Sequence, residues 1–277
     1  MSLSYIGNMS ENRKIILILS ILICLILLTI PNHGVAKEYT FVSLEFAPYS
    51  YCSNGTVKGL DVELLQECFR RMDEKLKIML VPWKRALCMG MYGQADGVFS
   101  ILLTPERNEK MFFSDPVRTE LMTLYVRKDS KLEFNGDLDE LKDFQLGVVR
   151  NFSYGNKVDN FVKNEISSGH IEVSVSPEMN ITKLIRKRFD VMVGDKISTI
   201  GAIRKLGVAG QIRQLGEPVS SNNIYVAFSR ELGHADLRDR FNVALKSMRA
   251  DGTWDRIINH YRELWDKQKD HLTNEVE

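Results

Sequence analysis

An arginine stands at the end of an apolar segment that should lie in a protein core. Residues 98–103 read VFSILL, which is typical of a buried strand, and the letters TPER follow at residues 104–107. The guanidinium of Arg107 would offer a planar set of hydrogen-bond donors that matches a carboxylate at two points. The alternative is structural, because Arg107 could cap the preceding turn or pair with Glu106 or Asp115 at the surface. The segment makes Arg107 a candidate for binding an anionic ligand group.

Five further residues with aromatic, hydroxyl or carboxylate side chains lie at the ends of predicted strands or at a predicted helix start. Ligands of open α/β sheets lie beyond the carboxyl ends of the strands, so side chains at these positions can converge on one cleft. Residues 151–153 lead into a helix predicted from about Tyr154, and free backbone N–H groups at this helix start would attract an anion. Structural alternatives remain, since Asp195 could cap the helix after it, and Phe46 and Trp83 could pack in the core. The five residues are Phe46, Trp83, Ser100, Ser153 and Asp195. Together with Arg107 they would complement a small zwitterion.

The elements that must position these residues alternate between short strand patterns and helix patterns. Strands alternating with helices predict βαβ units, which form parallel sheets with helices on both faces. The helical spacing is clear at residues 61–72, where apolar side chains recur every three or four positions. The predicted strands are residues 40–45, 77–81, 96–101, 145–149, 171–176, 190–195 and 224–229.

Two sets of these elements predict two lobes. The extended segments at residues 121–128 and 222–230 lie between the sets, and we expect them to cross from one lobe to the other as hinges. We predict an α/β fold in which each lobe is a mostly parallel sheet flanked by helices. Lobe 1 would comprise residues 37–121 and 225–277, and lobe 2 would comprise residues 122–224.

The N-terminal residues have the pattern of a targeting segment. Two basic residues precede an unbroken apolar run at residues 15–30, and the small residues Gly34 and Ala36 follow at the positions of a cleavage site. We predict a signal peptide, residues 1–36, that is cleaved after Ala36. The alternative is a retained membrane anchor, although the apolar run falls short of the roughly 20 residues that span a bilayer.

Composition argues against some partners and gives little support for catalysis. The predicted mature chain holds 35 basic and 35 acidic residues, because the targeting segment takes two of the 37 basic and one of the 36 acidic residues. This balance argues against nucleic acid as a partner. The five histidines lack metal-ligand spacing, and the sequence has no nucleophile elbow, no phosphate-binding glycine loop and no Cys-x-x-Cys motif. We therefore predict no catalytic residues, no metal site and no cofactor.

The mature chain would carry three cysteines, which could pair in an oxidising compartment. Each of Cys52, Cys68 and Cys88 could instead fill apolar space in the core. If a disulfide forms within lobe 1, we expect it between Cys68 and Cys88.

Five segments occur in an order that resembles a known family. They read FAPYSY, GTVKGLDVELL, DGVFSILLTPERNEKMFFSDP, FDVMVGD and LKSMRADGTWDRIINHY. In this order, over residues 38–265, they resemble the extracellular solute-binding proteins of family 3, the periplasmic amino-acid receptors of ABC importers. The resemblance implies the two-lobed type II periplasmic-binding fold, with the ligand held between the lobes.

The resemblance also implies roles for the candidate residues. Arg107 matches the arginine that binds a ligand α-carboxylate, and Asp195 matches the aspartate that binds the α-ammonium group. Phe46 and Trp83 match residues that sandwich the ligand side chain. The hydroxyl or backbone contacts to the carboxylate fall at Ser100 and Ser153.

Two positions depart from the family pattern. Leu102 stands where a second hydroxyl is common, and residues 151–153 read Asn-Phe-Ser in place of a small Gly-Thr-Thr type of start. These departures predict a weaker hold on a carboxylate, or a ligand that is not a plain α-amino acid.

The predicted function is capture of a small polar, amino-acid-like ligand in the periplasm by a monomer that delivers it to an ABC permease in the inner membrane. One alternative is a ligand-sensing module for a membrane signalling partner. Another is a dehydratase of the cyclohexadienyl type on the same fold, for which Glu45 is placed to act as a general acid.

Overall fold

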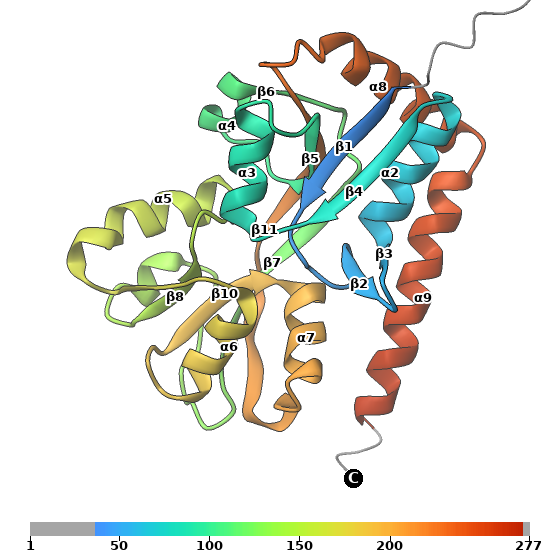
Figure 1. The fold of residues 1–277 in the computed structure, drawn as a ribbon. Helices are drawn as coiled ribbons and strands as arrows, with labels where there is room; N and C mark the ends of the chain where they lie inside the picture. Colours follow the sequence, from blue (N-terminus) through green and yellow to red (C-terminus); the bar gives the residue numbers. More distant parts are fainter. Residues whose placement is uncertain (1–36, 274–277) are drawn as a thin grey trace, which may run out of the picture. The chain divides into compact units, whose positions relative to one another are not determined.

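Two long antiparallel strands run through the middle of the main sheet. They are β7 (Arg118–Arg127) and β11 (Ile212–Ser229), which pair over nearly the whole length of β7 (Figure 1). The computed structural model describes residues 37–273, so the predicted signal peptide lies outside the described residues. The strand order of the sheet is β4-β1-β5-β11-β7-β10-β8-β9, and β6 pairs with β11.

The remaining strands are short and form both parallel and antiparallel pairs. Strand β1 pairs in parallel with β4 and β5, and β8 pairs in parallel with β9 and β10. Antiparallel pairs join β5 to β11 and β10 to β7, and β2 and β3 form a separate hairpin. The bounds are β1 Glu38–Ser43, β2 Tyr51–Ser53, β3 Thr56–Lys58, β4 Lys75–Leu80, β5 Gly97–Ile101, β6 Met111–Phe113, β8 Leu146–Val149, β9 Ile171–Ser174 and β10 Val191–Asp195.

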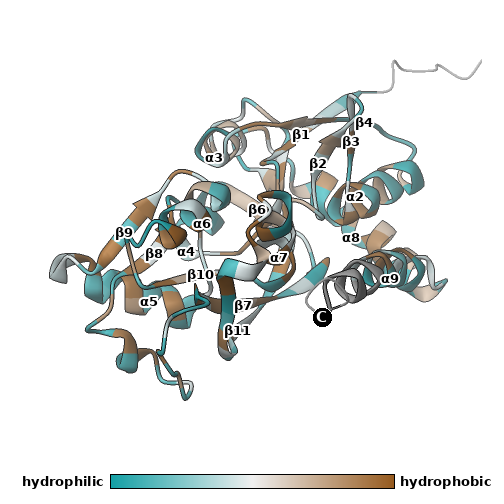
Figure 2. Cartoon of the chain, turned by 90° about the horizontal axis from the view of Figure 1, so that it is seen from below, coloured by the Kyte–Doolittle hydropathy of each residue, from teal (hydrophilic) through white to brown (hydrophobic). Residues whose placement is uncertain are grey.

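Helices connect most of the parallel strands, as the alternating sequence pattern predicted. Figure 2 shows brown and teal segments alternating along α2, α5 and α9, as expected of helices that cover a sheet with one face. In the part of the chain that the structure describes, no helix is long and apolar enough to cross a membrane. The bounds are α2 Leu60–Arg71, α3 Trp83–Met91, α4 Pro105–Lys110, α5 Asn156–Glu165, α6 Pro177–Ile185, α7 Lys196–Lys205, α8 Ala235–Ala250 and α9 Thr253–Thr273.

The strands beside β7 and β11 fall into two groups, which form the two lobes. Lobe 1 holds β1, β4, β5 and β6 with α2, α3, α4, α8 and α9, and lobe 2 holds β8, β9 and β10 with α5, α6 and α7 (Figure 1). This arrangement confirms the predicted α/β, two-lobed fold with two connecting strands. The predicted division of the chain after residues 121 and 224 falls inside β7 and β11, and it stays a prediction.

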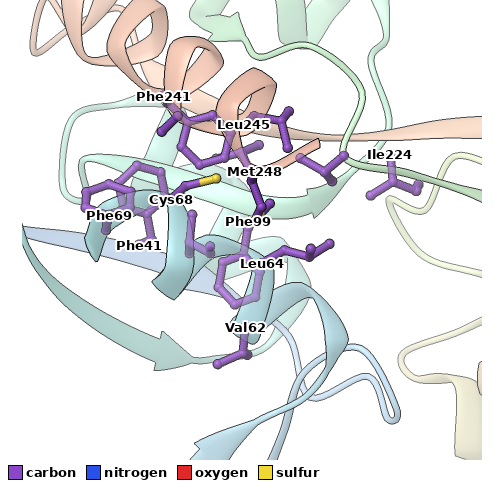
Figure 3. Packing of buried hydrophobic residues seen from close by; sticks show 14 of the residues in the cluster. Phe41, Val62, Leu64, Cys68, Phe69, Phe99, Ile224, Phe241, Leu245 and Met248 are labelled. Atoms are coloured by element: carbon purple, nitrogen blue, oxygen red, sulfur yellow. The ribbon is translucent and has the colours of Figure 1, made fainter. Parts of the chain in front are cut away.

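The core of lobe 1 combines the beginning and the end of the chain. Side chains of α2 (Leu64, Cys68 and Phe69) meet those of α8, including Phe241, around Phe41 of β1 (Figure 3). The helical spacing at residues 61–72 correctly predicted which face of α2 is buried. Burial of these apolar side chains stabilises the lobe by about 1.5–3 kcal/mol for each one removed from water.

Candidate ligand-binding pocket

One pocket is lined by residues of both lobes, and all six residues singled out from the sequence lie around it. Its free space is about 610 Å³, including solvent at its mouth. The six are Phe46, Trp83, Ser100 and Arg107 from lobe 1, and Ser153 and Asp195 from lobe 2. The structure therefore brings these residues together. Their contact with a ligand stays a prediction.

Arg107 points inward because of the turn that precedes it. The Thr104 side chain accepts a hydrogen bond from the backbone N–H of Arg107 at 3.3 Å, and Pro105 begins helix α4. The residue is only 6% exposed, and its guanidinium donates to two backbone carbonyls, those of Leu102 at 2.8 Å and Asn151 at 3.0 Å. Burial lowers the pKa of Arg107 to about 10. A guanidinium has five N–H donors, so the side chain keeps donors for a ligand.

Asp195 ends strand β10 and also caps helix α7. Its Oδ1 accepts hydrogen bonds from the backbone N–H of Ser198 at 2.7 Å and from the Tyr49 hydroxyl at 3.0 Å. Its Oδ2 is buried and finds no hydrogen-bond partner among residues 37–273. Burial raises the pKa of Asp195. The helix-capping role considered for this residue is therefore present, and one carboxylate oxygen remains available in the pocket.

A buried ionic network lies behind the pocket, and the sequence analysis missed it. Arg118 donates to both oxygens of Asp61, at 2.6 and 3.0 Å, and more weakly to Glu120 at 3.4 Å. Its guanidinium also lies 3.6 Å from the centre of the Tyr49 ring. Ser100, a pocket residue, donates its hydroxyl hydrogen bond to Asp61. The only sequence signal was the alternation Arg118–Glu120 at the start of a strand that reads as half-buried.

Glu120 belongs to both the network and the pocket lining. Its side chain is buried, with 6% of the residue exposed. Burial raises the pKa of Glu120 to about 8, and the nearby charge of Asp195 adds to the rise, while Arg118 opposes it. An acid with such a pKa holds its proton over much of the neutral range.

The N-terminus of α2 can reach this network because Gly59 precedes it. Gly59 has φ 131°, and a Cβ there would lie 2.3 Å from the Tyr49 carbonyl oxygen. The backbone N–H of Asp61 donates to that same oxygen at 3.0 Å. The close approach of the two segments brings both Asp61 and the Tyr49 ring into contact with Arg118.

Three aromatic rings form one wall of the pocket. The Phe152 ring of lobe 2 lies 6.1 Å from the ring of Phe46 and 6.1 Å from that of Trp83, nearly perpendicular to each. Such edge-to-face pairs are the favoured geometry of aromatic rings. The sequence singled out Phe46 and Trp83 as a sandwich for a ligand. The structure adds Phe152, whose only sequence signal was that it replaces a small residue of the family pattern.

Asn151 joins the two lobes through its carbonyl oxygen. This oxygen accepts from the Trp83 indole N–H at 2.9 Å and from Arg107 at 3.0 Å. Asn151 has φ 61°, in the left-handed region that asparagine tolerates better than most residues, and the pocket residue Ser100 has φ 57°. Two such conformations beside one pocket cost about 1–3 kcal/mol each and are frequent at functional sites.

The helix that the sequence predicts from about Tyr154 is present but begins two residues later, and residues 151–153 lie in the loop before it. Helix α5 begins at Asn156, and Asp159 on its first turn reaches back over the preceding loop. Its carboxylate accepts from the Ser153 hydroxyl at 2.5 Å and from the backbone N–H of Tyr154 at 2.7 Å. The physical reason is that these internal bonds and the left-handed Asn151 hold the loop outside the helix. Donors expected to face an anion are bound to Asp159.

The structure also bears on the expectations for the three cysteines and for Glu45. Cys52, Cys68 and Cys88 are free thiols; Cys68 is buried, whereas Cys52 and Cys88 are exposed and fill no core space. Glu45, the acid of the enzymatic alternative, lines a neighbouring pocket, and its half-exposed side chain lies 3.9 Å from Lys205. Within residues 37–273 no three acidic, histidine or cysteine side chains gather as a metal site.

Known proteins with similar sequences are named as amino-acid-binding proteins. The chain is 24% identical over 218 residues to the probable amino-acid-binding protein YxeM of Bacillus subtilis, which covers 77% of this chain and 79% of that protein. It is 25% identical over 223 residues to the histidine-binding periplasmic protein of Escherichia coli, which covers 78% of this chain and 84% of that protein.

The chain also resembles a solved structure and matches the model of a protein family. A histidine kinase sensor domain with similarity to periplasmic binding proteins has a TM-score of 0.72 and 17% identity, covering 84% of this chain and 97% of that chain. This likeness shows the fold. The model of the bacterial extracellular solute-binding proteins, family 3, matches residues 40–263. This match spans most of the chain and includes the elements that build the pocket, so the protein belongs to that family of solute-binding proteins.

Proposed function

We propose that this protein captures a small polar, amino-acid-like solute between its lobes and delivers it to an ABC import permease in the inner membrane. The observation that supports the proposal best is the pair Arg107 and Asp195. They are buried, carry opposite charges, come from different lobes and line one pocket. A ligand with a carboxylate and an ammonium group would satisfy both.

Closure of the lobes would follow from binding. Strands β7 and β11 connect the lobes and would absorb the change of angle as hinges. The hydrogen bonds from Trp83 and Arg107 to Asn151, and from Tyr49 to Asp195, join the lobes. A ligand that contacts both sides adds to these bonds, so it shifts the population toward the closed form.

We also propose that the protein acts in the periplasm. The family is extracellular, and the similar protein of Escherichia coli is periplasmic. We propose that residues 1–36 direct export to the periplasm and are removed after Ala36. Mass spectrometry of the exported protein would then find Lys37 at the N-terminus, whereas a retained segment would favour an anchored protein.

The pocket can be tested by substitution after a thermal-shift screen of the standard amino acids and small amines. Arg107→Ala and Asp195→Ala should each weaken the best ligand by about 2–5 kcal/mol, because a desolvated ligand charge loses its partner. This loss is roughly 30-fold to several thousand-fold in the dissociation constant. Arg107→Lys should recover little, since an ammonium group cannot make the two-point contact.

The control is Arg188→Ala, which removes an exposed arginine of lobe 2. Its affinity for the same ligand should equal that of the wild type in titration calorimetry. Wild-type affinity in Arg107→Ala would refute the proposed site. Failure of every tested amino acid and amine to bind would refute the amino-acid-like class of ligand.

A second candidate function is ligand sensing for a membrane partner. The likeness to a histidine kinase sensor domain supports it, because that domain shares the fold over 84% of this chain. The two functions differ in what a deletion of the gene abolishes. Loss of solute uptake would support transport, and loss of a transcriptional response with normal uptake would support sensing.

A further inference from the structure

Several hydrogen-bond donors on the carboxylate-binding side of the pocket are engaged within the protein. Arg107 gives two of its five N–H groups to backbone carbonyls. The Ser100 hydroxyl donates to Asp61, while the Ser153 hydroxyl and the Tyr154 N–H donate to Asp159. A carboxylate on a ligand would compete with these internal acceptors.

Acceptors, by contrast, remain available elsewhere in the pocket. The Oδ2 atom of Asp195, a residue 4% exposed, has no hydrogen-bond partner within residues 37–273. Glu120 lines the same pocket and receives a long 3.4 Å bond from Arg118, whose other donors hold Asp61 at 2.6 and 3.0 Å. The pocket therefore offers two acidic side chains whose hydrogen-bonding capacity is only partly used within the protein.

The strand register places these two carboxylates on one face of the sheet. Asp195 of β10 stands directly opposite Met122 of β7, and Glu120 lies two residues before Met122. Side chains two residues apart on a strand share a face, and such diagonal neighbours lie about 7–8 Å apart. An ammonium group, with three N–H donors, can lie between carboxylates at that separation.

We propose that Glu120 and Asp195 together bind one ammonium group, so that the ligand is a small organic cation recognised mainly by its positive end. This inference rests on the proposed solute-binding function and narrows its ligand class. The apolar body of the ligand lies against Phe46, Trp83 and Phe152, whose ring faces also attract a cation. A ligand with a net negative charge is rejected.

Binding by this pair releases a proton. The groups that face Glu120 are Arg118 on its own strand, Asp61 of α2, Tyr49 of the loop after β1, and Asp195 of β10. Because Arg118 is held by Asp61, burial leaves Glu120 protonated in the free protein near pH 7. The ligand ammonium takes the place of that proton, which passes to the buffer, and the ammonium itself stays fully protonated.

Titration calorimetry with three amino acids of similar length tests the ligand class. L-ornithine, L-glutamine and L-glutamate differ mainly in a side-chain charge of plus one, zero and minus one. We expect ornithine to bind at least about tenfold more tightly than glutamine, and glutamate to be weaker still, because like charges repel in a desolvated site.

The role of Glu120 is tested by Glu120→Gln, which keeps the shape of the side chain. At pH 8 the variant should bind ornithine at least about tenfold more weakly than the wild type. In the wild type, the association constant should rise by up to about tenfold per pH unit between pH 6 and pH 8. The slope should be shallower in the variant. Heats in phosphate and Tris buffers should differ by the ionisation heat of a proton released only by the wild type.

The matched control is Glu217→Gln, because Glu217 is an exposed acid on β11 outside the pocket. It should keep the wild-type affinity, pH slope and proton release. Glutamate binding more tightly than ornithine, no binding of ornithine, or a pH slope unchanged by Glu120→Gln would each overturn the inference. If another amino acid then binds in a manner that requires Arg107, the proposed solute-binding function stands and only the inference about Glu120 is refuted.

Discussion

Asp61 occupies the Nε and Nη2 edge of the Arg118 guanidinium, and this pairing influences the charge of the pocket. The bidentate contact, at 2.6 and 3.0 Å, neutralises Arg118 before Glu120 can pair closely with it. Glu120 is left with a 3.4 Å contact in a buried place. A single arginine with two acidic neighbours therefore leaves one acid whose proton can be exchanged for a ligand cation.

This arrangement predicts how the stability of the protein depends on pH. The folded state raises the pKa of Glu120 from 4.5 to about 8, so between these values the folded protein holds a proton that the unfolded chain has released. The contribution of Glu120 is fully present below pH 4.5 and is lost as the pH rises to about 8. Its slope is at most about 1.4 kcal/mol per pH unit.

The measurement is urea unfolding of the wild type and Glu120→Gln at pH 5, 6, 7 and 8. The free energy of unfolding of the wild type should fall relative to that of the variant as the pH rises. Glu217→Gln should run parallel to the wild type. Parallel curves for Glu120→Gln would show that Glu120 has an ordinary pKa in the folded protein.

Among the structural elements, the loop between β8 and α5 limits the size of the pocket. It carries Asn151, which bonds to lobe 1, and Phe152, whose ring meets both Phe46 and Trp83. Asp159 on α5 holds the end of this loop in place. The loop thus combines a contact between the lobes with the aromatic wall.

Replacing Phe152 should change which ligands fit. Phe152→Ala removes the ring between Phe46 and Trp83, so the pocket gains room on its apolar side. The affinity for L-arginine relative to L-ornithine should rise by at least about tenfold, the lower end of what a change in apolar pocket size achieves. Calorimetry with both ligands measures the ratio. An unchanged ratio would mean that the ligand does not extend toward Phe152.

The sequence predicted the parts of this site that depend on local pattern. The apolar run before TPER predicted Arg107 just beyond a buried strand, and in the structure Thr104 caps the turn there while Pro105 begins the helix. Asp195 was found by the same argument at the end of β10. These positions are determined by neighbours in the chain, so a single sequence contains the information.

The ionic network depends on contacts between distant segments, and no local pattern reveals it. Asp61 reaches Arg118 only because Gly59 allows α2 to approach the segment of Tyr49. Glu120 faces Asp195 only through the register of β7 and β10. The donors expected to face an anion at the start of this helix are engaged for a related reason, since Asp159 on the first turn of α5 binds the Ser153 hydroxyl and the Tyr154 N–H.

At the scale of the whole molecule, side chains of lobe 1 hold lobe 2 through a few hydrogen bonds. The indole N–H of Trp83 donates across to Asn151 at 2.9 Å. The indole N–H of Trp254 donates to Val117 at 2.8 Å within lobe 1. The two tryptophans thus make the same kind of bond, and only the first one joins the lobes.

This pair gives a test of lobe closure. Trp83→Phe keeps an aromatic ring in the pocket but removes the donor, so the balance between open and closed forms should shift toward the open form. Small-angle X-ray scattering of the free protein should show a larger radius of gyration than in the wild type. Trp254→Phe should leave it unchanged. An equal effect of both substitutions would mean that Trp83 does not contribute to closure.

The core of lobe 1 combines early and late segments of the chain, so lobe 1 can finish folding only late in synthesis. Strand β5 pairs with β11 at Ala227 and Phe228, and the helix that supplies Phe241 comes later still. The strands of lobe 2 are all available before these residues. During synthesis, lobe 1 therefore lacks its central neighbour and its covering helix until most of the chain exists. If the protein is exported as proposed, an unfinished lobe 1 would leave this part of the chain unfolded for passage through an export channel.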